Sequence, residues 1–405
     1  MTPYVITFIV MVGVFMIGCF AFKLPVGVSM LIAALCGALE GGLGTETIRM
    51  MVEGEFGYVD TILTIGCAMI FMKVIEGSGA LDALSSLIIE KFHRFPAVLL
   101  VLIMLIIMFP GMITGSSTAA VLSAGSIMAP VLALMGIDAV TSGSIIAMGA
   151  LLGMIAPPVN TAALIICAGI DVGFEGPLAL ITFPLAILFV LLLGYKQARH
   201  MDYEKLKPAL EKQDAIRKQY GVRIYIPLLV LVALMVIFKV LKLGEDIGMP
   251  LMFLISAAVG LFTGKKINVL TAVPEAIRTA APVMGILMGV GMFIEVMTAT
   301  GVRGLVVISC LRLPSTLWLL ACAISIPLFG AVSSYGACSV LGVPFAYIYA
   351  SLLGGNSVVV LAAISLIAAV GDMMPPTALA GLFAAQVTGV EKYTKILKRC
   401  IVPII

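Results

Sequence analysis

The stretch from Pro110 to Pro130 reads PGMITGSSTAAVLSAGSIMAP, and it decides the fold. Within it, an apolar segment is interrupted by glycine and by a cluster of hydroxyl side chains. Non-helical backbone at membrane depth is tolerated only where it is buried in protein or lines a cavity, so this break predicts a functional site. The cluster consists of Thr114, Gly115, Ser116, Ser117 and Thr118.

A second break follows at residues 155–161, which read IAPPVNT. Both breaks recur later in the chain. Ser334 lies 218 residues after Ser116, and Pro375 lies 218 residues after Pro157. The same two breaks therefore occur twice and in register, which predicts that the chain consists of two repeated halves.

The amino-acid composition indicates that much of the chain lies in lipid rather than in water. Hydrophobic residues make up 62% of the chain and charged residues 11%, whereas soluble proteins carry about 25% charged residues. The chain is therefore expected to cross a lipid bilayer several times. A net charge of +3 does not indicate a nucleic-acid partner, and the eight cysteines are scattered singly, as small core residues are.

Hydropathy predicts an all-α polytopic membrane protein with two inverted-topology repeats, covering residues 1–195 and 224–405. A charged linker, 196–223, separates them. Each repeat contains a re-entrant helical hairpin and a broken transmembrane helix, at about 96–135 and 142–168 in the first, and at about 314–350 and 357–388 in the second. The other predicted spans lie at about 4–22, 25–42, 60–76, 177–195, 225–241, 249–263 and 280–297, with an amphipathic connector at about 81–90.

The topology follows from counting crossings. Five crossings in each half, with a hairpin that returns to its own side, require the halves to be inverted. The positive-inside rule then places the linker in the cytoplasm and the N-terminus outside it. Most charges sort accordingly, with five cations as exceptions: Arg49, Lys239, Lys242, Arg303 and Arg312.

The chemistry of the breaks suits an ion and an anionic solute. Unpaired N–H groups at helix starts favour anions, and carbonyls of unwound chain favour a hard cation such as Na⁺. Hydroxyl and amide side chains add oxygens without a full charge to desolvate. For the substrate we assign Ser116, Ser117, Thr118, Pro157, Ser333, Ser334, Tyr335 and Pro375; for Na⁺ we assign Gly115, Ser116, Asn160, Thr161, Ser333, Gly336, Asp372 and Thr377. Small residues also mediate close helix packing, which stays open as the alternative for any single serine.

Asp372 is the strongest single candidate for a functional residue, because apolar residues precede it and MMPP follows it. Carboxylates inside a membrane usually have a function. Its counterpart at the offset of 218 is Met154, so the two half-sites differ. We interpret Asp372 as a Na⁺ ligand or a proton-coupling group, with hydrogen bonding to the freed backbone of the break as the alternative.

Several motifs resemble those of one transporter family. They are Gly115-Ser116-Ser117, Gly125-Ser126-Ile127-Met128, Gly153, Ile155-Ala156-Pro157-Pro158, Leu24-Pro25-Val26 and Gly77-Ser78-Gly79. Their order and spacing are similar, over nearly the whole chain, to the large membrane subunit of tripartite ATP-independent periplasmic (TRAP) transporters, within the ion transporter superfamily.

This resemblance implies secondary active, sodium-coupled uptake of a carboxylate, such as a C4-dicarboxylate or a sugar acid, by alternating access with an elevator-type movement. It also implies a small membrane subunit, an extracytoplasmic substrate-binding protein and a place in the bacterial inner membrane. Neither enzymatic activity nor a covalently bound cofactor is expected.

The two halves differ in two places. The first hairpin carries Gly115-Ser116-Ser117, where the second carries Ser333-Ser334-Tyr335. Pro403 matches Pro184 at an offset of 219, but the first half continues with apolar residues beyond that proline and the second half stops. We expect that the last span is incomplete in this chain, or that another polypeptide supplies its end.

Two other functions remain open from the residues alone. A sodium-translocating membrane subunit of a decarboxylase complex can also be built from inverted halves, and Asp372 alone could serve a cation or proton antiporter. An intramembrane aspartyl protease is not favoured, because it needs two apposed aspartates. The other candidate aspartates all fall at helix ends or in connectors: Asp60, Asp82, Asp138 and Asp171.

Overall fold

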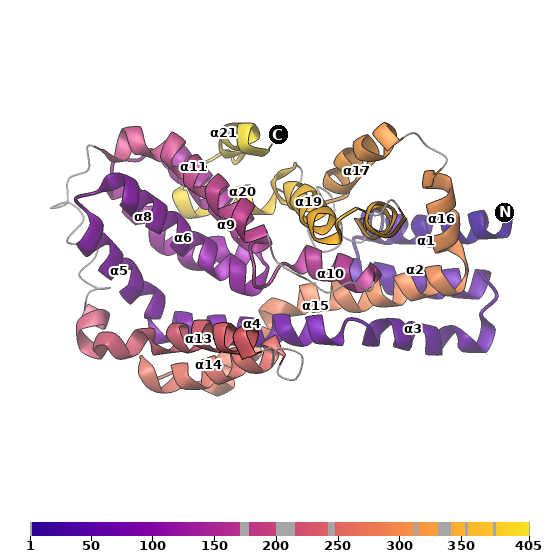
Figure 1. The fold of residues 1–405 in the computed structure, drawn as a ribbon, viewed down its shortest axis with the longest axis horizontal. Coiled ribbons are helices and arrows are strands. Elements are labelled where there is room, and N and C mark those ends of the chain that lie inside the picture. Colours follow the sequence, from indigo (N-terminus) through magenta and orange to yellow (C-terminus); the bar gives the residue numbers. More distant parts are fainter. Residues whose placement is uncertain are drawn as a thin grey trace. The chain divides into compact units, whose positions relative to one another are not determined.

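The structure is a computed structural model, and it describes residues 2–170, 178–199, 215–241, 248–311, 315–330, 342–352, 355–375 and 378–404. Within these ranges every regular element is a helix and no strand occurs (Figure 1). In the described part of the chain, five helices are long and apolar enough to cross a membrane, or six if the bent pair α3–α4 counts as one span. The prediction of an all-α polytopic membrane protein is confirmed.

The first half of the chain begins with α1 (Thr2–Phe20) and α2 (Val26–Glu40) and ends with the long helix α11 (Leu178–Ala198). The elements between them are the short η1 (Gly44–Glu46), α3 (Thr47–Phe56), α4 (Val59–Ser78), α5 (Ala80–Phe92), α6 (Pro96–Thr114), α7 (Ser117–Ala120), the π-helical turn η2 (Val121–Gly125), α8 (Ser126–Leu134), α9 (Ala139–Ile155) and α10 (Thr161–Ile170).

The second half begins with the 3₁₀ turn η3 (Gly221–Tyr225) and α13 (Ile226–Leu241), and its last helix is α21 (Thr394–Ile404). The elements between them are α14 (Met249–Thr263), α15 (Val269–Ala299), α16 (Val302–Leu311), α17 (Ser315–Gly330), the π-helical turn η4 (Tyr347–Leu352), α19 (Ser357–Val370), the 3₁₀ turn η5 (Gly371–Met373) and α20 (Leu379–Thr388).

Hydropathy missed three helical segments that are either charged or short. The helix α15 begins at Val269 rather than near 280, since Glu275 and Arg278 lower the mean hydropathy of its first part. The Asn268 side chain accepts a hydrogen bond of 3.1 Å from the Leu270 N–H at this helix start. The polar helix α3 was missed for the same reason, whereas α16 has no charged residue besides Arg303 and was missed because its 10 residues are too few for a span.

Packing divides the chain into two compact units, and neither follows the halves of the sequence. Unit 1 comprises residues 1–63, 161–177 and 280–377, and unit 2 comprises residues 64–160, 178–279 and 378–405. Each broken helix is shared between them: unit 2 holds α9 and α20, and unit 1 holds α10 and α19. The division into sequential repeats, with boundaries at 195 and 224, stays a prediction.

The centre of unit 2 is α9, which is buried from Thr141 to Ile155. Asp138 starts this helix, because its carboxylate accepts a hydrogen bond of 2.9 Å from the Thr141 N–H. The helices α6, α11, α20 and α21 pack around it. Figure 1 shows α6, α8 and α9 side by side in this unit.

Unit 1 is held together by close backbone approach between helices. A methyl group on Gly27 of α2 would collide with the Gly285 backbone of α15, and one on Gly54 of α3 would collide with the Gly291 backbone. Small residues at helix crossings allow this contact, which is typical of membrane-embedded helices. In the same unit α1 packs on α2, and α10 and α17 both pack on α19.

Candidate functional site

The tip of the first hairpin is a turn organised by its own hydroxyl groups. The helix α6 ends at Thr114, whose hydroxyl donates to the Pro110 carbonyl at 2.7 Å and accepts from the Ser116 N–H at 3.3 Å. Gly115 has φ 62°, a left-handed conformation that favours glycine. Ser116 is extended, and its hydroxyl accepts from the Ala119 N–H at 3.3 Å, so it starts the second arm as an N-cap.

The break between α9 and α10 lies at residues 156–160, as the sequence predicted. Pro157 and Pro158 have no N–H to continue the helical hydrogen bonds. The Asn160 side chain is fully buried and donates from Nδ2 to the Ile155 carbonyl at 2.9 Å, which satisfies one of the freed carbonyls at the end of α9. Thr161 directly follows and starts α10.

The hairpin tip and this break form one structure. The Val159 N–H donates to the Met112 carbonyl at 3.0 Å, just before the hairpin turns. A Cβ on Gly111 would lie 2.9 Å from the Met154 nitrogen, and a Cβ on Gly153 would lie 2.8 Å from the Met108 Cα. The backbones of α6 and α9 therefore touch where both helices end.

This geometry brings together the predicted site residues of the first half. Gly115, Ser116, Ser117 and Thr118 lie at the tip, and Pro157 and Asn160 lie in the break beside it. Two helix C-termini, those of α6 and α9, meet here, and the carbonyl ends of helices attract cations. The start of α7 adds N–H groups of the kind that attract anions.

The second half places Asp372 in the corresponding break. Asp372 is 4% exposed and lies in η5, directly after α19. A Cβ on the preceding Gly371 would lie 2.7 Å from the Gly330 Cα, at the end of α17. Pro375 lies in the turn that follows η5.

The contact at Gly371 repeats the one at Gly153, which lies 218 residues earlier. In both halves a glycine at the break contacts the backbone of the helix, α6 or α17, that the sequence predicts as the first arm of a hairpin. The remaining predicted site residues lie outside the described part of the chain: Ser333, Ser334, Tyr335, Gly336 and Thr377.

Arg303 has a role that the sequence analysis did not assign. In unit 1 its guanidinium donates to the Gly169 carbonyl at 2.6 Å, in the last turn of α10, and lies 5.3 Å from the ring centre of Tyr347. A cation at a helix C-terminus satisfies orphan carbonyls and opposes the helix dipole. Arg303 could have been found from the sequence, because it is one of the five cations that do not follow the positive-inside rule in the predicted topology. Arg49, another exception, pairs with Glu53 at 2.8 Å.

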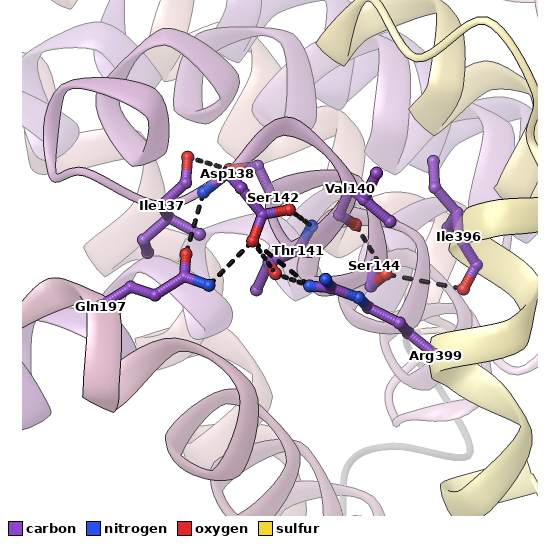
Figure 2. A network of polar contacts seen from close by, with 9 residues as sticks. All are labelled: Ile137, Asp138, Val140, Thr141, Ser142, Ser144, Gln197, Ile396 and Arg399. Atoms are coloured by element: carbon purple, nitrogen blue, oxygen red, sulfur yellow. Dashed lines mark hydrogen bonds and ion pairs between the residues drawn. The ribbon is translucent and has the colours of Figure 1, made fainter.

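A polar network fixes the start of α9 (Figure 2). The Asp138 carboxylate accepts hydrogen bonds from the Thr141 hydroxyl at 2.6 Å and from the Gln197 amide at 2.8 Å, and Arg399 of α21 lies 3.3 Å away. Partial burial would raise the pKa of Asp138, but these hydrogen bonds and the Arg399 charge together lower it. The network joins α9, α11 and α21.

Buried backbone breaks with hydroxyl, amide and carboxylate side chains, set among apolar helices, are typical of secondary transporters. The chain belongs to the family "Tripartite ATP-independent periplasmic transporter, DctM component", whose family model matches residues 12–403. No curated protein matches the chain.

The resemblance seen in the sequence is thereby confirmed. The chain is a multi-pass inner-membrane component of a secondary transporter of organic anions, and it works with a small membrane subunit and a periplasmic binding protein.

Proposed function

We propose that this chain catalyses sodium-coupled uptake of a carboxylate, such as a C4-dicarboxylate or a sugar acid. Transport proceeds by alternating access between two inverted halves, with an elevator-type movement. The N-terminus and the binding protein lie on the extracytoplasmic side, and the linker 196–223 lies in the cytoplasm. The observation that carries the proposal is the junction between the first hairpin tip and the α9–α10 break, supported by the family.

The coupling ion is Na⁺, bound at the ends of the broken helices. In the first half, Gly115, Ser116, Asn160 and Thr161 hold it with carbonyl, hydroxyl and amide oxygens, which suit a hard cation. In the second half, Ser333, Gly336, Asp372 and Thr377 hold it. The burial of Asp372 supports this role, because ionisable residues inside membrane-embedded helices commonly mark ion or proton pathways.

The substrate carboxylates bind to N–H groups and hydroxyls at the two hairpin tips. These are contributed by Ser116, Ser117 and Thr118 on one side and by Ser333, Ser334 and Tyr335 on the other, with Pro157 and Pro375 keeping the adjacent chain non-helical. Family membership favours this function over a decarboxylase subunit. It also disfavours a cation or proton antiporter, because such a protein would move ions without carrying the solute that the binding protein delivers.

The first test is transport by the complete three-component system in proteoliposomes, with labelled C4-dicarboxylates and sugar acids. Uptake should require the binding protein and an inward Na⁺ gradient. Uptake driven equally well by a proton gradient without Na⁺ would contradict sodium coupling.

The ion site is tested by Asp372→Asn, with Asp60→Asn as the matched control because Asp60 is exposed in the first turn of α4. Asp372→Asn should raise the Na⁺ concentration for half-maximal uptake about 10- to 100-fold, while Asp60→Asn leaves it unchanged. An unchanged Na⁺ dependence in Asp372→Asn would remove this residue from the ion site.

The substrate site is tested by Ser116→Leu and Ser334→Leu, with the exposed Ser126→Leu as control. Each of the first two should abolish uptake, since a bulky apolar side chain then occupies the hairpin tip. Full activity of either variant would exclude that residue from the site.

A further inference from the structure

Unit 2 contains an apolar groove between α4, α14 and the first turns of α15. The groove has a volume of about 160 Å³ and is open to one side, and its lining is apolar throughout. Phe71 and Phe253, both fully buried with ring centres 6.0 Å apart, hold α4 against α14 beside it. Side chains that line the groove include Val74, Leu254, Ala258, Leu261, Val269 and Ala272.

One end of the groove lies at the turn between α14 and α15, which carries Lys265 and Lys266. Leu261 precedes this turn and Val269 follows it, and both line the groove. The Lys265 N–H donates to the Ser78 carbonyl at 3.2 Å, which fixes the turn against the end of α4. Among the described residues neither lysine side chain has an acidic partner.

Two acidic groups on the neighbouring helices α4 and α15 are already paired. Lys73 of α4 lies 3.0 Å from Glu275 and 3.2 Å from Glu76. Lys73 thus engages Glu275 and Glu76, while Lys265 and Lys266, which have no acidic partner among the described residues, can attract an anion at the end of the groove.

We propose that this groove binds an anionic phospholipid, with one acyl chain along the apolar lining and the phosphate at Lys265 and Lys266. Apolar surface attracts the chain, and lysines near a membrane surface attract anionic headgroups. The exposed side chains of Phe262 and Leu270 flank the two lysines and extend the apolar surface.

The size of the groove favours a lipid chain over a partner helix. A helix with its side chains is about 10–12 Å across. The groove is too small for a whole helix and could accept only single side chains of a partner helix. A hydrocarbon chain can lie along the groove and fill it. This binding site does not depend on the transport mechanism proposed above.

The test measures phospholipid retained by the full-length protein after purification from vesicles of phosphatidylglycerol and phosphatidylcholine, counted by native mass spectrometry. Lys265→Gln/Lys266→Gln should lower the preference for phosphatidylglycerol about 5- to 30-fold and leave binding of phosphatidylcholine unchanged. Ala258→Phe, which fills the groove, should lower retention of both lipids.

Two controls separate this site from general membrane affinity. Lys395→Gln/Lys398→Gln removes two exposed lysines of α21, and Leu229→Phe enlarges an exposed apolar residue of α13; neither should change retention. Equal retention by the wild type and all variants would overturn the proposal. In a parallel co-purification with the small membrane subunit, loss of that subunit from Ala258→Phe, with lipid retention unchanged, would assign the groove to a protein partner instead.

Discussion

The Val159 N–H donates a hydrogen bond of 3.0 Å to the carbonyl oxygen of Met112. This bond joins a helix break to a hairpin tip, and the hairpin's second arm and the whole of α9 lie between them in the sequence. Because the Met112 carbonyl and the Val159 N–H satisfy each other, the chain can leave helical geometry at both places without exposing backbone polar groups to hydrocarbon. The tip and the break are therefore expected to move together in any transport cycle.

Replacing the glycines at the two breaks with alanine should destabilise the protein. In Gly153→Ala and in Gly371→Ala the new methyl group meets backbone, so we expect a loss of about 1–3 kcal/mol of stability. Gly13→Ala in α1 is the control, because its methyl group meets nothing within 4 Å and alanine favours a helix by up to about 1 kcal/mol. Thermal unfolding in detergent measures the stability of all three variants. Equal stabilities in all three variants would contradict the close packing.

The N-cap at Ser116 predicts a graded series. Ser116→Ala removes the acceptor for the Ala119 N–H and should cost about 1 kcal/mol of unfolding free energy, while Ser116→Asn keeps an oxygen acceptor and should cost little. Denaturant unfolding measures this cost. If Ser116→Asn is as unstable as Ser116→Ala, the hydroxyl has a role other than capping.

Arg303 should stabilise the end of α10. Arg303→Met removes its hydrogen bond to the Gly169 carbonyl and should lower stability by about 1–2 kcal/mol, and Arg303→Lys should recover part of the loss. Arg278→Met is the control, since Arg278 is exposed in α15. A destabilisation of the same size in Arg278→Met would show that the effect arises from lost charge alone.

Asp138 predicts a dependence of stability on pH. Its pKa is lower in the folded protein than the usual 3.8, so its contribution is fully present above that value and is lost as the pH falls through the folded pKa. The difference in stability between the wild type and Asp138→Asn should therefore be largest near neutral pH and shrink in acid. A difference that grows on acidification would refute the ion pair with Arg399.

Helix breaks have a strong signal in this sequence, because prolines and clustered hydroxyls inside apolar runs have few structural explanations. The first hairpin, the α9–α10 break and the break after α19 all lie where the repeated motifs indicated. The offset of 218 recurs in the structure, where α9 and α10 start at 139 and 161 and α19 and α20 start at 357 and 379.

Tertiary contacts could not be predicted from the sequence. Nothing in a hydropathy profile distinguishes Gly153, which contacts backbone, from Gly13, which contacts nothing. The polar helix α3 was hidden because Arg49, Glu53 and Glu55 resemble a loop in composition. Arg303 could have been singled out from the sequence, since the predicted topology places this cation outside the cytoplasm, where an internal partner would explain it.

The shared use of the broken helices has a consequence for biosynthesis. Unit 2 includes residues 378–405, and unit 1 includes both residues 1–63 and residues 280–377. A ribosome must therefore deliver most of the polypeptide before either unit has all its parts, and early segments must wait in the bilayer for late ones. We expect nascent chains released before α20 to be degraded or held by an insertase rather than to accumulate as a stable half-protein.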